Sequence, residues 1–342
     1  MLFLNNDTLL TPDWLPPLFQ AFADEDRLGA AGPLLLYADN TVQHLGVTFS
    51  TSGVFHLYRG LPKDHPVVPK KRKFQALTGA ALMLPKTLFF EAGCFYEEYK
   101  NGFEDVDLCL QIYKRGKVLR CIAESSVFHL ESQTPGRKNH EQHNSDLFIE
   151  RCADLFHIDL HLHGWRDGLK PVVGDLLSIH LVTGETRDLE LRRQFEACAP
   201  GQRQALLAQH PFWIWGHERL AELLYEARHY AESCYFLATA LDKFASLEGF
   251  KKLLFQARQT EQTALVELAE KNLQKIRTLY ENNQIKFTTI INKLLHKADQ
   301  GNDKLLRRLL EEKIAEVKNR PELAGEATSP ADSAPAVNRG RA

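Results

Sequence analysis

The sequence predicts an α/β domain followed by an all-helical region. Over roughly the first 150 residues, short apolar runs typical of buried strands alternate with segments of helical periodicity. Beyond about residue 200, strand signals vanish and apolar residues recur at helical spacing. The length of 342 residues fits two domains, and 44% hydrophobic with 25% charged residues is typical of a globular protein.

The first domain is predicted to open with a short apolar strand at Leu2–Leu4, of the type that is usually buried. A fold rarely opens with such a strand, so either this strand is an edge of the sheet or a portion is missing upstream. A helix is expected to begin at Pro12 and Asp13. An acidic first turn, a shared apolar face and Gly116 as the stop residue predict a helix over 104–114. Further strands are predicted at 29–37, 42–49, 76–84 (interrupted by Thr78-Gly79), 118–122 and 127–129, and further helices at 86–92 and 139–155.

The predicted boundaries are 1–155 for the α/β domain, 156–199 for a linker, 200–320 for a helical domain and 321–342 for a disordered tail. Within the helical domain, Leu223–Arg228 recurs in similar form thirty positions later as Leu253–Arg258. One helical hairpin there resembles the tetratricopeptide type. True repeats and plain paired helices both remain open, with paired helices favoured by the loose match. In either case the helical region could bind protein.

Composition excludes several classes of partner. The formal net charge of −2 provides no field for binding nucleic acid. The six cysteines form no CxxC pair, which favours free thiols in a reducing cytosol over a zinc or disulfide site. No apolar run is long enough for a transmembrane helix. The basic residues 70–73 are expected in a solvated loop within 59–73, while peripheral contact with the inner face of a membrane stays open.

Three polar features at the ends of predicted strands or helices could carry chemistry. Asp7 follows a strand, where it could form an Asx turn or bind a hard divalent cation. Glu104 and Asp105 open a helix, where they could complement the helix dipole or include a general base. His129 ends a strand, where it could be a structural hydrogen-bonder or a metal ligand.

Two other groups of residues are interpreted as structural. His157, His161 and His163 alternate with apolar residues, which favours a strand or irregular linker with exposed imidazoles over a metal site. The cluster of Phe212, Trp213 and Trp215 is expected to pack between helices rather than to form a platform for sugar stacking.

Taken in order, six segments of residues 1–150 resemble the family 2 glycosyltransferases. The match is specific because all six occur in the family's order. The segments are Phe3–Thr8 with Trp14-Leu15 (the DxD-type segment), the strand pair Gly32–Tyr37 and Val42–Val47, Leu77–Leu82 ("TGA"), Ala92–Glu97 ("GGFDE"), Gly102–Leu110 ("GEDVDL") and Val127–His129.

The resemblance implies a GT-A-like mixed sheet and a role for each matched residue. Asp7 and His129 would bind a divalent metal, magnesium or manganese. Asn5 stands where many relatives have the first Asp of DxD, at the nucleotide contact. Asp105 would be the general base, and Glu104 would shape the site or contact the acceptor. The acceptor side would be lined by Thr78, Gly79 and Ala80. Cys94 and Tyr96 depart from "GGFDE", replacing its Gly and Asp.

The function implied is that of an inverting glycosyltransferase. It would move a sugar from a nucleoside-diphosphate donor to a hydroxyl of a glycan or related acceptor, as in cell-envelope polysaccharide synthesis. In this family a nucleotide-binding β-α-β-α-β segment precedes the DxD-type strand, so we expect that a portion is missing upstream of residue 1. The alternative is an inactive truncated fragment that acts through its helical region as an interaction module.

Overall fold

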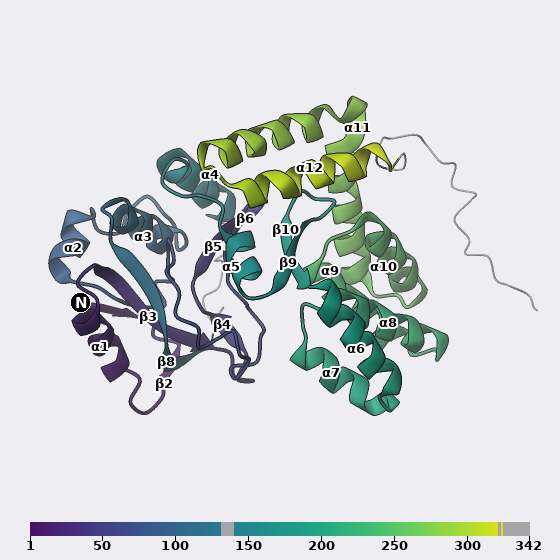
Figure 1. Cartoon of the computed structure of the whole chain (residues 1–342), viewed down its shortest axis with the longest axis horizontal. Helices are drawn as coiled ribbons and strands as arrows, with labels where there is room; N and C mark the ends of the chain where they lie inside the picture. Colours follow the sequence, from purple (N-terminus) through teal and green to yellow (C-terminus); the bar gives the residue numbers. More distant parts are fainter. Residues whose placement is uncertain (131–139, 321–322, 324–342) are drawn as a thin grey trace, which may run out of the picture. The chain divides into compact units, whose positions relative to one another are not determined.

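The computed structural model describes residues 1–130, 140–320 and 323 (Figure 1). It divides into two compact units: Met1–Lys170 with Leu181–Gly216, and Pro171–His180 with His217–Ala342. The first unit is built around a mixed sheet and the second is helical, as the sequence predicts. The expected tail, 321–342, lies outside the described residues except for Leu323.

Six strands form the main sheet of the first unit. Its order is β1 (Leu2–Leu4), β7 (Ala81–Met83), β3 (Leu28–Leu36), β8 (Val118–His129) and β2 (Thr8–Leu10), with β4 (Val42–His44) also paired to β3. Only β3 and β8 run parallel, while the other pairs are antiparallel. The predicted mixed sheet is therefore confirmed.

Helices cover both faces of this sheet (Figure 1). α1 (Pro16–Asp24) packs Leu18 and Ala21 against one face. On the other face, α3 (Glu104–Lys114) contributes Leu108 and Ile112 to the larger core. The bounds of α3 are those predicted, and α2 (Lys86–Glu91) ends one residue before its predicted end. Burial on both faces is what makes β3 apolar along its whole length.

The first strand lies at an edge of the sheet, one of the two alternatives that the sequence left open, and it is not buried. β1 pairs only with β7 and forms an edge of the sheet, so Leu2 and Leu4 are 36% and 39% exposed. Strand β2 was not predicted, and its Leu9 and Leu10 are exposed as well. The helix expected at Pro12 begins only at Pro16, because Asp13 has a φ of 55°, outside the helical range.

Four other predicted strands are divided, joined or shortened. The segment 42–49 is split into β4 and β5 (Val47–Ser50), because Gly46 between them has a φ of 141°. β5 then forms a hairpin with β6 (Gly53–His56). The predicted strands 118–122 and 127–129 are one continuous strand, β8, and the strand expected over 76–84 is reduced to β7.

The segment with three histidines was also misread. After α4 (Glu141–Cys152), residues Leu160–Arg166 form α5 instead of a strand or linker. His161 and His163 are buried rather than exposed, and His163 stacks on Phe74. Within the described part of the chain, no group of three or more His, Cys, Asp or Glu side chains is placed to hold a metal ion, so these histidines form no such cluster.

The basic loop is only partly solvated. Lys70 lies 2.9 Å from Asp167, and Arg72 lies 2.6 Å from the same carboxylate. The Arg72 side chain is only 8% exposed, so for this residue the prediction of a solvated loop is wrong. The carboxylate also accepts a hydrogen bond from the Tyr58 hydroxyl. The cluster ties the loop to the end of α5.

The chain then forms the hairpin β9 (Leu169–Val173) and β10 (Ile179–Thr183), followed by α6 (Glu185–Ala197) and α7 (Arg203–Gln209). Trp213 and Trp215 both pack edge-on against Phe195 of α6, which confirms their predicted packing role. The later helices are α8 (Ile214–Glu226), α9 (Tyr230–Lys243), α10 (Leu247–Gln259), α11 (Thr263–Gln300) and α12 (Lys304–Lys318).

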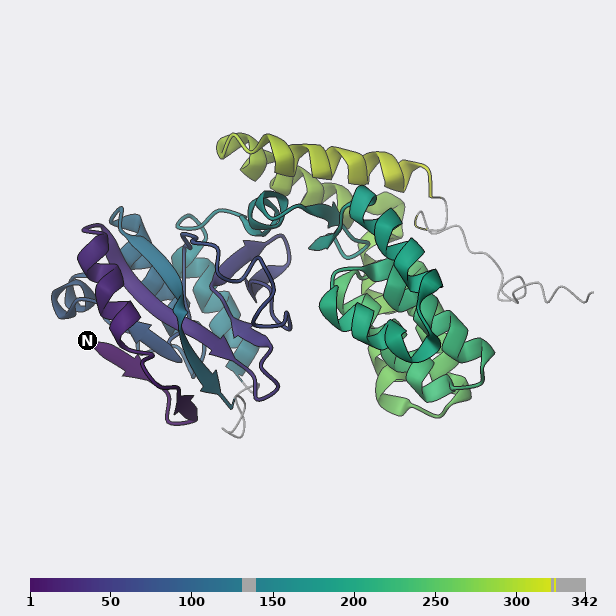
Figure 2. The same ribbon diagram turned by 60° about the horizontal axis from the view of Figure 1, so that its bottom comes forward.

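In the second unit, α9, α10, α11 and α12 pack in sequence, and α12 lies along α11 (Figure 2). Such packing suits paired helices, and tetratricopeptide repeats stay a prediction. Among the described residues, no helix combines the length and apolar character required to cross a membrane.

His217 predicts a pH dependence for the second unit. It is buried in α8, and within the described residues neither ring nitrogen has a hydrogen-bond partner. Burial, with Lys243 nearby, lowers the pKa of His217 to about 4 from 6.5. Between pH 6.5 and about pH 4, His217 is protonated in the unfolded chain but stays neutral in the folded chain. The unfolding free energy therefore falls as the pH falls through this range.

Replacing His217 with Phe should remove this dependence and preserve the ring packing against Phe236. From about pH 7 to about pH 4.5, the wild type should lose about 2.5 kcal/mol more unfolding free energy than the variant. Urea unfolding across that range measures the difference. Parallel curves for the two proteins would show that His217 is not buried in its neutral form.

Candidate functional site

The turn between β1 and β2 brings three of the predicted site residues together. Because β2 pairs with β8, Thr8 is the partner of His129, and Asp7 lies next to it. Asp7 Oδ1 is 3.2 Å from His129 Nε2, and Asn5 Nδ2 is 3.3 Å from the same nitrogen. The structure thus places Asn5, Asp7 and His129 in direct contact, although 124 positions separate the first from the last.

The other side of the His129 ring is held by Gln43, which was not predicted from the sequence. Gln43 Oε1 lies 2.7 Å from His129 Nδ1, and Gln43 Nε2 donates to the backbone oxygen of His129 at 2.9 Å. Both side chains are buried. The only available signal was a polar residue within the strand predicted over 42–49.

Asp7 and His129 fit a divalent cation of the kind that shares substrate oxygens. Asp7 Oδ1 is buried and, within the described residues, makes no hydrogen bond of good geometry even to His129. An acceptor oxygen facing an imidazole nitrogen is stable only if a proton or a cation lies between them. Magnesium and manganese commonly take few protein ligands and complete their shell with phosphate oxygens and water.

Asp105 is fixed at the start of α3 by backbone donors. Its Oδ2 accepts from Gly79 N at 2.6 Å, and its Oδ1 accepts from Val106 N at 2.8 Å. The chain enters the helix through Gly102, with a φ of 153°, and Phe103, with a φ of 74°. Glu104 Oε2 accepts from Gly102 N at 2.6 Å, so this side chain holds the turn that presents Asp105.

The segment Thr78–Ala80 connects these groups. Ala80 O accepts from Asn5 N at 2.9 Å, and Gly79 N donates to Asp105. Thr78 N donates to His44 Nε2 at 3.4 Å. Three consecutive residues thus contact the Asn5 turn, the Asp105 carboxylate and strand β4. This arrangement links the predicted metal side and the predicted base through one short backbone segment.

His44 is a second residue that sequence reasoning missed. It is buried beside the Thr78 segment, and its Nδ1 lies 2.8 Å from His56 Nδ1. Burial, followed by the nearby His56 and His129, holds the pKa of His44 well below its usual range. The ring is therefore neutral at physiological pH. It can accept the Thr78 N–H through Nε2 while Nδ1 donates to His56.

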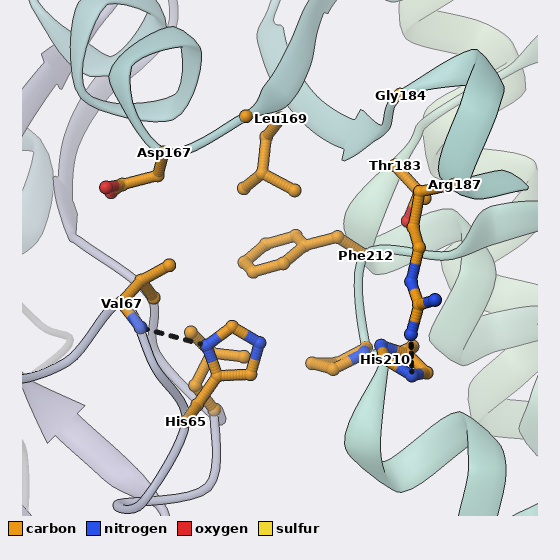
Figure 3. Close-up of a pocket in the computed structure, with 12 residues that line it drawn as sticks. His65, Val67, Asp167, Leu169, Thr183, Gly184, Arg187, His210 and Phe212 are labelled. Carbon is orange, nitrogen blue, oxygen red and sulfur yellow. Dashed lines mark hydrogen bonds between the residues drawn. The ribbon is translucent and has the colours of Figure 1, made fainter.

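A pocket of about 190 Å³ lies elsewhere in the first unit (Figure 3). Leu169 and Phe212 point into it, and Arg187 donates to His210 Nε2 at 3.4 Å along one side. Burial, followed by Arg187 and His65, lowers the pKa of His210. None of the predicted site residues lines this pocket.

Gly79→Ala tests how closely the Thr78–Ala80 segment must approach α3. An added Cβ would lie 3.0 Å from Asp105 Cβ, closer than the neighbour can accept without moving. We expect any transfer activity to fall by roughly 10²-fold, the size of effect that a displacement of about 1 Å can cause. The assay is kcat at saturating acceptor, with Gly201→Ala, where an added Cβ meets nothing within 4 Å, as the control. Equal activity in the two variants would contradict the close approach.

Comparison with known proteins identifies relatives of this chain. No protein-family model matches the chain. The O-antigen biosynthesis protein RfbC of Myxococcus xanthus is 32% identical over 139 residues, which cover 39% of this chain and 11% of that protein. The uncharacterized protein y4gI of Sinorhizobium fredii is 29% identical over 143 residues, 40% of this chain and 16% of that protein.

An N-acetylglucosaminyl-diphospho-decaprenol L-rhamnosyltransferase of Mycobacterium tuberculosis is 24% identical over 209 residues, 56% of this chain and 66% of that enzyme. Over part of its length, the chain is therefore a distant homologue of glycosyltransferases, as its motifs predicted. It spans only 11% and 16% of the length of the first two relatives.

Proposed function

We propose that the first unit contains the metal-binding and acceptor-binding part of an inverting glycosyltransferase. The observation that carries the proposal is that the Thr78–Ala80 segment binds both the Asp105 carboxylate and Asn5, which together with Asp7 contacts His129. The distant homology to glycosyltransferases supports the same reaction class.

In the proposed reaction, Asp105 accepts the proton of an acceptor hydroxyl as that oxygen attacks the anomeric carbon. Each Asp105 oxygen already accepts one backbone N–H, and each keeps a second lone pair for substrate. The two backbone donors hold the carboxylate in one orientation. Attack opposite the leaving diphosphate gives inversion in a single displacement, by the geometry known from inverting glycosidases.

Asp7 and His129 would hold the magnesium or manganese ion, which would neutralise charge on the leaving diphosphate. Asn5, in contact with His129, stands close enough to help orient the donor. Gly79 lacks a side chain where the acceptor would approach the backbone. The proposed donor is a nucleoside-diphosphate sugar, and the proposed acceptor is a hydroxyl of a cell-envelope glycan. Two of the relatives bear names from that chemistry.

The test is release of nucleoside diphosphate that depends on both acceptor and Mn²⁺. Two proteins should be assayed with a panel of nucleotide sugars. One is the chain alone, and the other is the chain fused to the C-terminus of a donor-binding segment of the kind that the resemblance implies. Acceptor-dependent release should disappear in Asp7→Asn and persist in the control Asp26→Asn, whose carboxylate is exposed. The proposal would be contradicted if no nucleotide sugar gave acceptor-dependent release, or if Asp7→Asn released as much diphosphate as the wild type.

A further inference from the structure

We infer that Gln43 is a positioning residue that fixes the tautomer and orientation of His129, so that the Nε2 lone pair faces Asp7 and any metal bound there. The inference rests on the proposed function for the identity of the metal, but the tautomer assignment follows from hydrogen bonds alone.

The orientation of the Gln43 amide is determined by what it contacts. The backbone oxygen of His129 can only accept, so the atom of Gln43 that lies 2.9 Å from it must be the NH₂ group. The other end of the amide, 2.7 Å from His129 Nδ1, is then the carbonyl oxygen, which can only accept. His129 Nδ1 must therefore carry a proton, so a neutral ring keeps its lone pair on Nε2.

This tautomer is not the one that Asp7 alone would select. A proton on Nε2 could be donated to Asp7 Oδ1, 3.2 Å away, which would close both groups to a metal. Asn5 Nδ2 reaches the same nitrogen at 3.3 Å as a donor, which again requires a lone pair on Nε2. Two amides, one from strand β4 and one from the turn after β1, thus favour the one tautomer that can bind a cation. The second ring nitrogen of a metal-bound histidine is commonly fixed in this way.

The strand register explains why Gln43 lies next to His129. β4 and β8 both pair with β3, where Leu36 is the partner of Val42 and also of Phe128. Gln43 and His129 are thus each one residue from the same position of the sheet, and the register shift between Leu35 and Leu36 leaves Gln43 as the unpaired, bulged residue of β4. Gln43 is only 5% exposed, so water has little access to its amide and the side chain has little freedom to turn.

The experiment compares Gln43→Met and Gln43→Glu with the full-length wild-type chain. Methionine keeps the length and removes both hydrogen bonds, whereas glutamate keeps the acceptor for Nδ1–H. Gln75→Met is the matched control, because Gln75 is also buried and also holds a histidine backbone, with Nε2 donating to His157 O at 2.8 Å. Long-range ¹H–¹⁵N correlation spectra report the His129 tautomer, assigned from the signals missing in His129→Asn. Binding of Mn²⁺, added as its chloride, is followed by paramagnetic broadening.

We expect the Nδ1–H tautomer in the wild type, in Gln43→Glu and in Gln75→Met, and loss of that tautomer in Gln43→Met. Mn²⁺ affinity should fall by roughly 10–100-fold in Gln43→Met, as is usual when the partner of a metal-bound histidine is removed. An Nε2–H tautomer in the wild type would overturn the inference without any variant. An unchanged tautomer and affinity in Gln43→Met would also overturn it, and if that variant does not fold, loss of the tautomer in Gln43→Glu would do so.

The design separates this inference from the proposed function. A wild-type Nδ1–H tautomer, lost in Gln43→Met, supports the role of Gln43 whether or not Mn²⁺ binds. Mn²⁺ broadening that persists in Asp7→Asn would remove the metal site from the proposed function and leave the tautomer assignment standing.

Discussion

Asp105→Asn is expected to lower kcat for sugar transfer by roughly 10²–10⁴-fold, the range that a general base usually contributes. The amide oxygen of asparagine can still accept the Gly79 N–H, which the Asp105 carboxylate accepts at 2.6 Å. It cannot take up a proton from the acceptor hydroxyl. Donor affinity should therefore change little while turnover is lost. The measurement is steady-state transfer by a polypeptide that carries this chain with a donor-binding segment.

Asp107→Asn, two residues further along α3, is the matched control. Asp107 is buried and bound to Arg151 Nε at 2.7 Å and to the Tyr99 hydroxyl at 3.2 Å. Its removal should lower the melting temperature while kcat stays near the wild-type value. If Asp105→Asn transfers sugar within about tenfold of wild type, another residue must be the base.

Lys313→Met is expected to cost the second unit about 3 kcal/mol of unfolding free energy. Lys313 Nζ lies 2.7 Å from Asp175, and the two side chains are only 2% and 3% exposed. Removing one member of a buried ion pair leaves the other charge buried without a partner in a medium of low polarity, which destabilises the fold. Arg320, 2.9 Å from the same carboxylate, would remain, so we expect the lower end of the usual range of roughly 3–5 kcal/mol.

Urea unfolding of the second unit's helices measures this loss. The control is Lys251→Met, which removes an exposed pair with Glu248 and should cost less than about 1 kcal/mol. Equal effects of the two substitutions would mean that the Asp175 carboxylate is reached by water. It would then follow that the Lys313 pair does not hold segment 171–180 against α12.

The local sequence pattern was sufficient to predict some helices and strands, and to identify the site residues that belong to recognisable motifs. The helix over 104–114 was predictable because its acidic first turn, its apolar spacing and Gly116 all agree. The contact between Asp7 and His129 was foreseen from their motifs. The roles of these residues, and of Asp105, stay predictions.

What could not be predicted depends on partners distant in sequence. Gln43 acquires its significance only through His129, 86 positions later. The exposure of β1 follows from its place at a sheet edge, which its apolar residues left open as one of two alternatives. In 157–163, alternation suggested a strand, but His161 and His163 lie in a short helix buried by tertiary packing.

Anomalous X-ray scattering from crystals soaked in MnCl₂ and a nucleoside diphosphate tests the central claim most directly. We expect a manganese peak about 2 Å from an Asp7 carboxylate oxygen and from His129 Nε2, with diphosphate oxygens completing its shell. The same peak should be missing in Asp7→Asn crystals. A manganese peak elsewhere, or none, with Asp7 and His129 still in direct contact beside a bound nucleotide, would contradict the central claim.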